Sequence, residues 1–188
     1  MQASVDEAQV REAQVREAQV REAEAGLAPE GEGWFIVNIA DSEGLRTDTL
    51  GSGTMFEASI GDFPQFGINV RVLAPGQRAS MYHREDRQEA FLILDGECTL
   101  VVEDAERPVR KGDFIHLPAG TAHVIVGAGE GPSTVLMVGA RTADPGISFP
   151  VSEVAAKYGA SVEEETTDGA VANAGLEIER AKFGKVPW

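Results

Sequence analysis

Short apolar runs, separated by residues that favour turns, fill the central part of the chain. Each run is rich in Val, Ile, Leu and Phe and short enough for one strand. The pattern predicts strands over residues 34–40, 66–73, 90–94, 97–102, 113–117, 123–128 and 133–140. Many short strands with regular turns between them are typical of an all-β sandwich or barrel, and not of alternating strands and helices.

Three turn signals lie between these runs. Asp95-Gly96 stands between two apolar runs, where glycine supplies the positive φ that a tight turn needs, so we expect a hairpin there. Ala105 to Pro108 is predicted to be a second turn. Pro118-Ala119-Gly120 is predicted to be a third.

The N-terminal segment repeats "EAQVR" three times between Glu7 and Arg21. Its residues favour helix, and acid and arginine stand four positions apart in each repeat. A five-residue period advances a helix by about 140° per repeat at about 3.6 residues per turn, so the valines form no stripe and a heptad coiled coil is excluded. We expect a solvated helical arm; an oligomerising segment and plain disorder stay open. Residues 26–33 read as a linker.

The C-terminal segment predicts two short helical stretches. Ser152 can cap the first, whose Val154 and Tyr158 share a face, and Gly159 can end it. The second is expected near Ala170–Ala174. Phe183 and Trp188 would tether the tail by packing on the β domain. The chain therefore divides into an arm and linker (1–33), a β domain (34–149) and an extension that packs on it (150–188).

Charge and cysteine content narrow the classes of partner. The net charge of −15 and the pI near 4.5 argue against nucleic acid and against an anionic membrane surface. Cys98 is the single cysteine, which excludes an internal disulfide, and we expect it to be half buried in a strand and not reactive. There is no secretory signal and no apolar run of about 20 residues, so we expect a cytoplasmic protein.

Candidate chemistry centres on His83, His116 and His123, the only histidines. In an extended strand His83 and Glu85 face the same side, and Glu89 follows at the start of the next apolar run. Imidazole and carboxylate together suit Fe, Mn, Zn or Ni. Taken on spacing alone, however, a His-x-Glu pair on a strand is more often a surface pair than a set of metal ligands.

Two segments resemble the paired motifs of the cupin superfamily. Gly112, Pro118, Gly120 and His123 in "GDFIHLPAGTAH" stand at the intervals of the second motif, G-x5-P-x-G-x2-H-x3-N, with Gly127 in place of the final Asn. The resemblance covers about residues 66–140. It implies a cupin double-stranded β-helix (jelly-roll) barrel of the single-domain type, here with an N-terminal helical arm and a short C-terminal helical segment.

The first cupin motif, G-x5-H-x-H-x3,4-E-x6-G, fits in one of two alignments. Counting forward from Gly76 puts Tyr82 and Arg84 at the histidine positions; counting back from Glu89 and Gly96 puts His83 and Glu85 there. The second alignment is physically better, because the first would aim a cation at the metal. The resemblance thus implies His83, Glu89 and His123 as ligands of one divalent metal ion, with Glu85 as a substituted fourth ligand.

The substitution at Glu85 shifts the expected metal preference. Two histidines with two carboxylates favour Fe or Mn, with Zn or Ni as alternatives. Glu85 could instead bind a metal-bound water, and Glu85 or His116 could act in proton transfer; a partly buried structural role for His116 is the other reading. We expect four further residues to be solvated on the outer face or the rim of the barrel: Tyr82, Arg84, Asp86 and Arg87.

Three functions fit the cupin resemblance. The first is a metal-dependent enzyme of the oxygenase or isomerase type, acting on a small organic molecule between apolar walls that include Phe91, Ile93, Leu100 and Val124. The second is a non-catalytic module that binds or stores the metal or a small-molecule ligand. The third is a structural barrel without metal. The resemblance also implies a homodimer.

Overall fold

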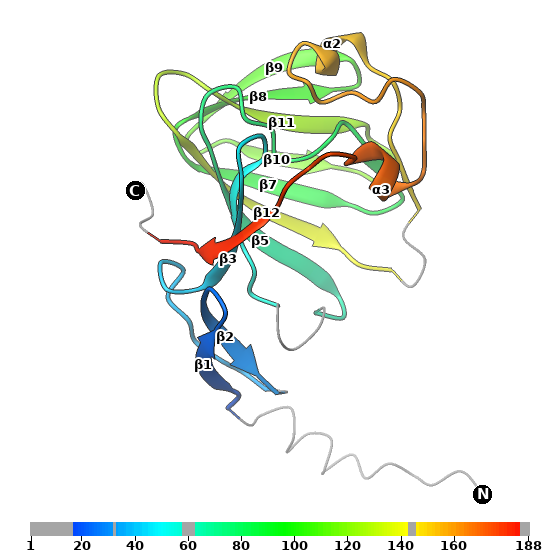
Figure 1. The fold of residues 1–188 in the computed structure, drawn as a ribbon. Helices are drawn as coiled ribbons and strands as arrows, with labels where there is room; N and C mark the ends of the chain where they lie inside the picture. The colour runs from blue at the N-terminus through cyan, green and yellow to red at the C-terminus, as the bar shows by residue number, and fades with distance from the viewer. Residues whose placement is uncertain (1–16, 32, 58–62, 143–145, 185–188) are drawn as a thin grey trace, which may run out of the picture.

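The computed structural model describes residues 17–31, 33–57, 63–142 and 146–184, which form fourteen strands and two short helices (Figure 1). A seven-stranded sheet has the order β10-β7-β12-β5-β4-β3-β14, a three-stranded sheet the order β11-β8-β9, and the pairs β1-β2 and β6-β13 stand apart. The strands are β1 Gln19–Ala23, β2 Gly26–Glu30, β3 Glu43–Thr47, β4 Gly51–Thr54, β5 Phe66–Leu73, β6 Arg84–Glu85, β7 Glu89–Asp95, β8 Glu97–Val102, β9 Ala105–Arg110, β10 Phe114–Leu117, β11 His123–Ala128, β12 Ser133–Ala140, β13 Ile147–Ser148 and β14 Glu179–Lys182.

The main core lies between the two larger sheets. Phe91 and Ile93 of β7 pack there with Leu100 of β8 and Ile125 of β11, which come from the facing sheet. The all-β prediction is confirmed, and three of the four residues predicted as apolar walls point into this core. Val124 is the exception: it points to the other side of its sheet, into a second cluster with Tyr82, because successive strand residues alternate in direction.

The turn at Asp95-Gly96 is not the predicted hairpin. Gly96 does have the expected positive φ of 76°. However, β7 and β8 belong to different sheets, and the turn carries the chain from one to the other. A Cβ atom on Gly96 would lie 2.7 Å from the carbonyl oxygen of Pro132. The crossing therefore also requires a residue without a side chain at this position.

The predicted turn at Ala105–Pro108 is wrong as well, because these residues belong to β9. The turn lies just before them, at Glu103 and Asp104, which have positive φ angles of 46° and 55°. Pro108 is tolerated because β9 is the edge of its sheet, where a strand can lack a donor. The turn at Pro118–Gly120 is confirmed by the hydrogen bond from Thr121 N to Pro118 O (3.2 Å).

Residues 34–40 do not form the predicted strand; Trp34 alone makes a bridge, with Glu17. The seven-stranded sheet instead contains β3 and β4, which we did not predict. Their sequences, EGLRT and GSGT, have too few apolar residues to show a strand pattern.

The N-terminal region forms a hairpin where we expected helix and linker. Residues 1–16 lie outside the described residues, but Gln19–Ala23 and Gly26–Glu30 pair as β1 and β2. The hairpin lies against the rest of the fold at Gly26, whose φ is 139° and whose Cβ would lie 2.8 Å from Glu43 N. For Gln19, Val20 and Arg21, the last residues of the repeat, pairing with β2 overrides the local helical propensity.

The C-terminal segment packs on the outside of the three-stranded sheet. Helix α2 (Glu153–Ala156) begins at Ser152, whose Oγ accepts a hydrogen bond from Ala155 N (3.0 Å), and Gly159 follows with φ 64°. Ala155 and Ala160 contact the cluster of Tyr82, Val101 and Val124. This confirms the first predicted helix.

Helix α3 (Gly169–Ala172) confirms the second helical stretch, and strand β14 pairs with β3. Phe183 is buried as predicted, whereas Trp188 lies outside the described residues. The domain boundaries themselves stay a prediction. No helix in the described part of the chain combines the length and the apolar composition that crossing a membrane requires.

Candidate metal centre

The two histidines of the candidate site are direct neighbours across two chain segments. His83 N donates to His123 O (3.1 Å), and His123 N donates to His83 O (2.8 Å). Backbone pairing of this kind places both side chains on one side, and the ring centroids lie 4.8 Å apart. Both residues are buried. His123 is positioned by the Pro118–Gly120 turn, which ends just before β11 begins.

A backbone carbonyl fixes the orientation of each imidazole. His83 Nδ1 lies 2.8 Å from Met81 O, and His123 Nδ1 lies 3.0 Å from Thr121 O. Because a carbonyl oxygen can only accept, each Nδ1 carries the proton of the neutral ring. Each Nε2 is then left with a lone pair, which is the form in which histidine binds a metal.

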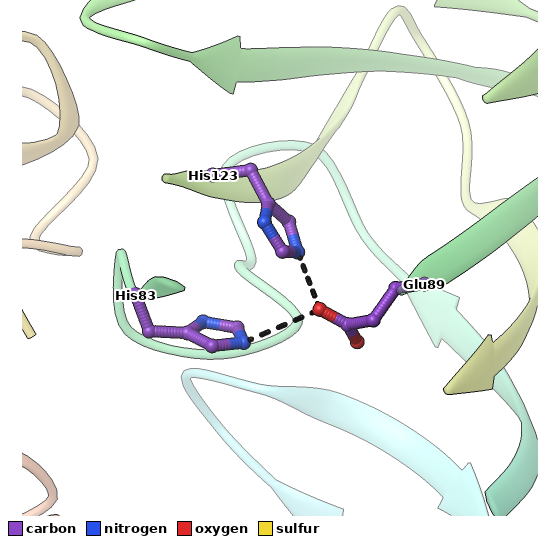
Figure 2. Close-up of side chains that lie close together, drawn as sticks. All are labelled: His83, Glu89 and His123. Carbon is purple, nitrogen blue, oxygen red and sulfur yellow. Dashed lines mark ion pairs between the residues drawn. The ribbon is translucent and has the colours of Figure 1, made fainter. Parts of the chain in front are cut away.

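The carboxylate of Glu89 lies where these two lone pairs converge (Figure 2). Glu89 is the first residue of β7, and its Oε2 lies 3.1 Å from His123 Nε2 and 3.8 Å from His83 Nε2. Ligands about 2.1 Å from one metal ion are separated by roughly 3.0–3.4 Å in octahedral or tetrahedral geometry. The ligand atoms of the three residues lie within 4.8 Å of one another, so a small adjustment suffices.

The short contact between His123 and Glu89 does not satisfy the imidazole. His123 Nε2 is buried and has no hydrogen-bond partner, despite its 3.1 Å separation from the carboxylate oxygen. Because both Nδ1 protons are donated to backbone carbonyls, the Nε2 lone pairs of His83 and His123 face the Glu89 carboxylate. A cation among them would remove this repulsion, so the residues present fit a metal ion.

The charges of the surroundings favour the same ligand states. Burial, together with the neighbouring His123, lowers the pKa of His83 and keeps its ring neutral. Burial alone would raise the pKa of Glu89, but the contact with His123 and the positive charge of Arg87 nearby hold this pKa below its usual range. Neutral imidazole and ionised carboxylate are the forms that bind metal.

Glu85 lies beside the three residues but not among them. Its Oε1 is 4.0 Å from His83 Nε2, and its Oε2 forms an ion pair with Arg87 at 2.9 Å. Burial, followed by repulsion from Glu89, raises the pKa of Glu85. The structure therefore brings together His83, Glu89 and His123, with Glu85 at their edge.

Two of the residues expected to be solvated on the outer face or the rim are not exposed. Tyr82 is only 2% exposed, and its hydroxyl accepts a hydrogen bond from Asp104 N (3.2 Å). Arg87 lies against the site, with its Nε buried and unpaired among the described residues. The sequence could have indicated that Arg87 lies at the site, because side chains alternate along an extended chain and residues 83, 85, 87 and 89 therefore share one side. Arg84 and Asp86 are exposed, as predicted.

His116 is not part of the cluster. It lies on β10 between the buried Ile115 and Leu117, and its side chain is exposed on the opposite face. The alternation of a strand thus excludes both the cavity position and the partly buried position that we considered.

Comparisons with known proteins give one family match and several matches to solved structures. The family model of the cupin domain matches residues 69–139. Among solved structures, a sugar phosphate isomerase from Silicibacter pomeroyi, described as from a cupin superfamily, is 28% identical (58% of this chain, 66% of that chain, TM-score 0.46). A Cupin 2 conserved barrel domain protein from Salinispora arenicola is 24% identical (50% and 70%, TM-score 0.38).

The polyketide cyclase RemF from Streptomyces resistomycificus is 16% identical, with 58% of this chain and 82% of that chain covered and a TM-score of 0.49. A further solved structure, from Acidithiobacillus ferrooxidans, is 27% identical with a TM-score of 0.46; this chain spans 62% of that protein and 66% of the one from Silicibacter pomeroyi. No curated protein matches the chain.

Proposed function

We propose that this chain, whose residues 69–139 match the family model of the cupin domain, binds one divalent metal ion through His83, Glu89 and His123 and acts as a metal-dependent enzyme on a small organic molecule. The observation that carries the proposal is the buried, unpaired Nε2 of His123, which faces the Glu89 carboxylate. Two imidazoles with one or two carboxylates favour Fe or Mn over Zn or Ni.

The surrounding side chains support chemistry in a partly dry site. Phe91 lies 5.5 Å from the His123 ring and Phe149 lies 6.1 Å from the His83 ring, centroid to centroid, so both exclude water from the imidazoles. A bound divalent ion polarises a carbonyl group or activates water or oxygen. Glu85, whose pKa is raised, would hold or release a proton at Oε1, beside His83. Oxygenase and isomerase types both use such an arrangement.

Metal binding is tested by elemental analysis of chelator-treated protein reloaded with Fe(II) or Mn(II). We expect one ion per chain in the wild type, and in the control His116→Gln, whose side chain is exposed. The variant His123→Gln should lose most of the metal. Equal metal content in His116→Gln and His123→Gln would contradict the proposed ligand set.

Turnover is tested with the Fe(II)-loaded protein. Its electronic spectrum is followed under oxygen as candidate small molecules are added, and products are sought by mass spectrometry. A spectral change with product formation supports the enzyme. The same change without any product supports the alternative, a module that binds metal and ligand without turnover.

The ion pair between Glu85 and Arg87 favours this alternative, because at 2.9 Å it holds Oε2 of Glu85 on Arg87 and leaves only the other carboxylate oxygen free. A protein that takes up no metal would be the structural barrel. The homodimer also remains a proposal, and light scattering of the full chain tests it.

A further inference from the structure

A second group of polar side chains lies on the interior face of β5, away from the metal centre. Arg71 pairs across the sheet with Val135 of β12, and Asn69 pairs with Met137. Val135 and Met137 belong to the core between the sheets, and directly paired residues of antiparallel strands point the same way. Arg71 and Asn69 therefore point into the barrel, where an apolar pair would be expected.

Arg71 has no counter-ion there. Its side chain makes no hydrogen bond or ion pair with any residue that the structure describes, and burial lowers its pKa. Glu43, which lies on the same face of the sheet on strand β3, is already paired with Arg180 at 3.2 Å. Arg71 is half-buried, and a cation partly removed from water without a partner destabilises a fold, so its presence needs a reason.

Asn69 is unsatisfied in the same region. Its Oδ1 is buried and has no hydrogen-bond partner among the described residues. Its neighbour Met137 pairs on the other side with Phe91, whose ring lies 5.5 Å from that of His123. Asn69 therefore lies between Arg71 and the metal centre along the interior of the barrel.

The fold leaves room for the guanidinium. Gly53 of β4 is the cross-strand partner of Arg71, and a Cβ atom there would lie 3.0 Å from both Cδ and Nη1 of Arg71. The arginine side chain thus lies flat over a glycine. Any larger residue at position 53 would press on it.

We propose that Arg71 and Asn69 form an anion-binding subsite inside the barrel, and that the small molecule bound there carries a carboxylate or a phosphate group. A guanidinium suits both anions, because each can accept two parallel hydrogen bonds from it. As the substrate class of the proposed enzyme, this inference rests on the proposed function, but anion binding itself needs no metal. The same molecule would extend past Asn69 and present another oxygen to the metal centre.

The test is a calorimetric titration of the full-length, metal-free protein with inorganic phosphate and, separately, with succinate. We expect wild-type protein to bind at least one of the two, and the arm that binds identifies the anion. Arg71→Met should weaken this binding at least about tenfold, because hydrogen bonds to charged groups are worth about 1.5–3 kcal/mol. The matched control Arg46→Met, at an exposed position of β3, should bind like the wild type.

Thermal unfolding provides a second readout. Phosphate stabilises most proteins without binding, so the quantity of interest is the difference between variants. The anion should raise the Tm of the wild type and of Arg46→Met more than that of Arg71→Met. In the absence of anion, Arg71→Met should unfold at a temperature equal to or above that of the wild type, because it removes an unpaired buried charge.

Should Arg71→Met not fold, Arg71→Lys keeps the charge and loses the paired hydrogen bonds, so it should bind several-fold more weakly. The inference is overturned if wild-type protein binds neither anion, or if the Arg71 variants bind as tightly as Arg46→Met. Since the titrations use metal-free protein, failure of metal binding leaves their outcome unaffected, and the two proposals fail separately.

Discussion

Replacing Glu89 with glutamine separates a metal ligand from a structural ion pair. In the metal-free protein the Glu89 carboxylate lies 3.1 Å from His123 Nε2, whose lone pair is buried and unpaired. A glutamine in the same position can turn its NH2 group toward that lone pair and donate a hydrogen bond. The substitution therefore removes a repulsion and satisfies a buried acceptor.

The size of the effect follows from these contacts. Leaving a buried acceptor unsatisfied costs about 1–3 kcal/mol. Since the amide must also adopt one orientation, we expect Glu89→Gln to raise the free energy of unfolding of the metal-free protein by about 1 kcal/mol, or about 2–4 °C in Tm for a chain of this size. Metal affinity should fall at least tenfold, because a neutral amide replaces an anionic ligand.

The assay is urea unfolding in the presence of a chelator, at a pH of about 8, where histidine with an ordinary pKa of about 6.5 is neutral. Glu163→Gln, at an exposed position, is the matched control and should change neither stability nor metal affinity. If Glu89→Gln were destabilised by 1 kcal/mol or more and still bound metal like the wild type, Glu89 would be the partner of a protonated histidine and not a ligand.

Three further predictions concern the core and the site. Cys98 is buried, its Sγ donates to Ser133 Oγ (3.0 Å) and burial raises its pKa, so a thiol reagent at pH about 8 should react slowly with native protein and fully after denaturation; rapid native labelling would contradict this. Because the folded pKa of His83 is lowered, the unfolded chain takes up a proton first, and the stability of metal-free protein should fall as pH drops below about 6.5; denaturant titrations that show no such loss would refute the shift. Gly96→Ala, with φ 76° and a Cβ 2.7 Å from Pro132 O, should lower the free energy of unfolding by at least about 2 kcal/mol, and a neutral effect would exclude the crossing turn.

Regular apolar strands were the part of the fold most readily predicted from sequence. The bounds of β5, β8, β11 and β12 match the predicted runs, because their hydrophobic residues reflect burial directly. Strands β3 and β4 were missed, because glycine and polar residues there carry pairing without an apolar pattern. The hairpin of β1 and β2 was missed for a different reason: its residues favour helix locally, and the contacts of Gly26 with Glu43 come from distant parts of the chain.

For the site, motif spacing identified His83, Glu89 and His123, which the structure brings together. The same motif did not indicate Arg87 or Arg71, because an arginine in a sequence reads as a solvated residue. In "FGINVRVL" the apolar positions 68, 70 and 72 lie on the face away from the main core, whereas Asn69 and Arg71 point into it. Such inversions of the usual pattern can be recognised once the pairing of strands is known, and at Asn69 and Arg71 the inversion is what supports the proposed anion subsite.

Anomalous diffraction from a crystal grown without chelator, measured at the absorption edges of Fe and Mn, tests the metal centre most directly. The account predicts one peak per chain, about 2.0–2.3 Å from Nε2 of His83, Nε2 of His123 and a carboxylate oxygen of Glu89. A metal-loaded crystal with no peak there, or with the two imidazoles turned away from each other, would contradict it.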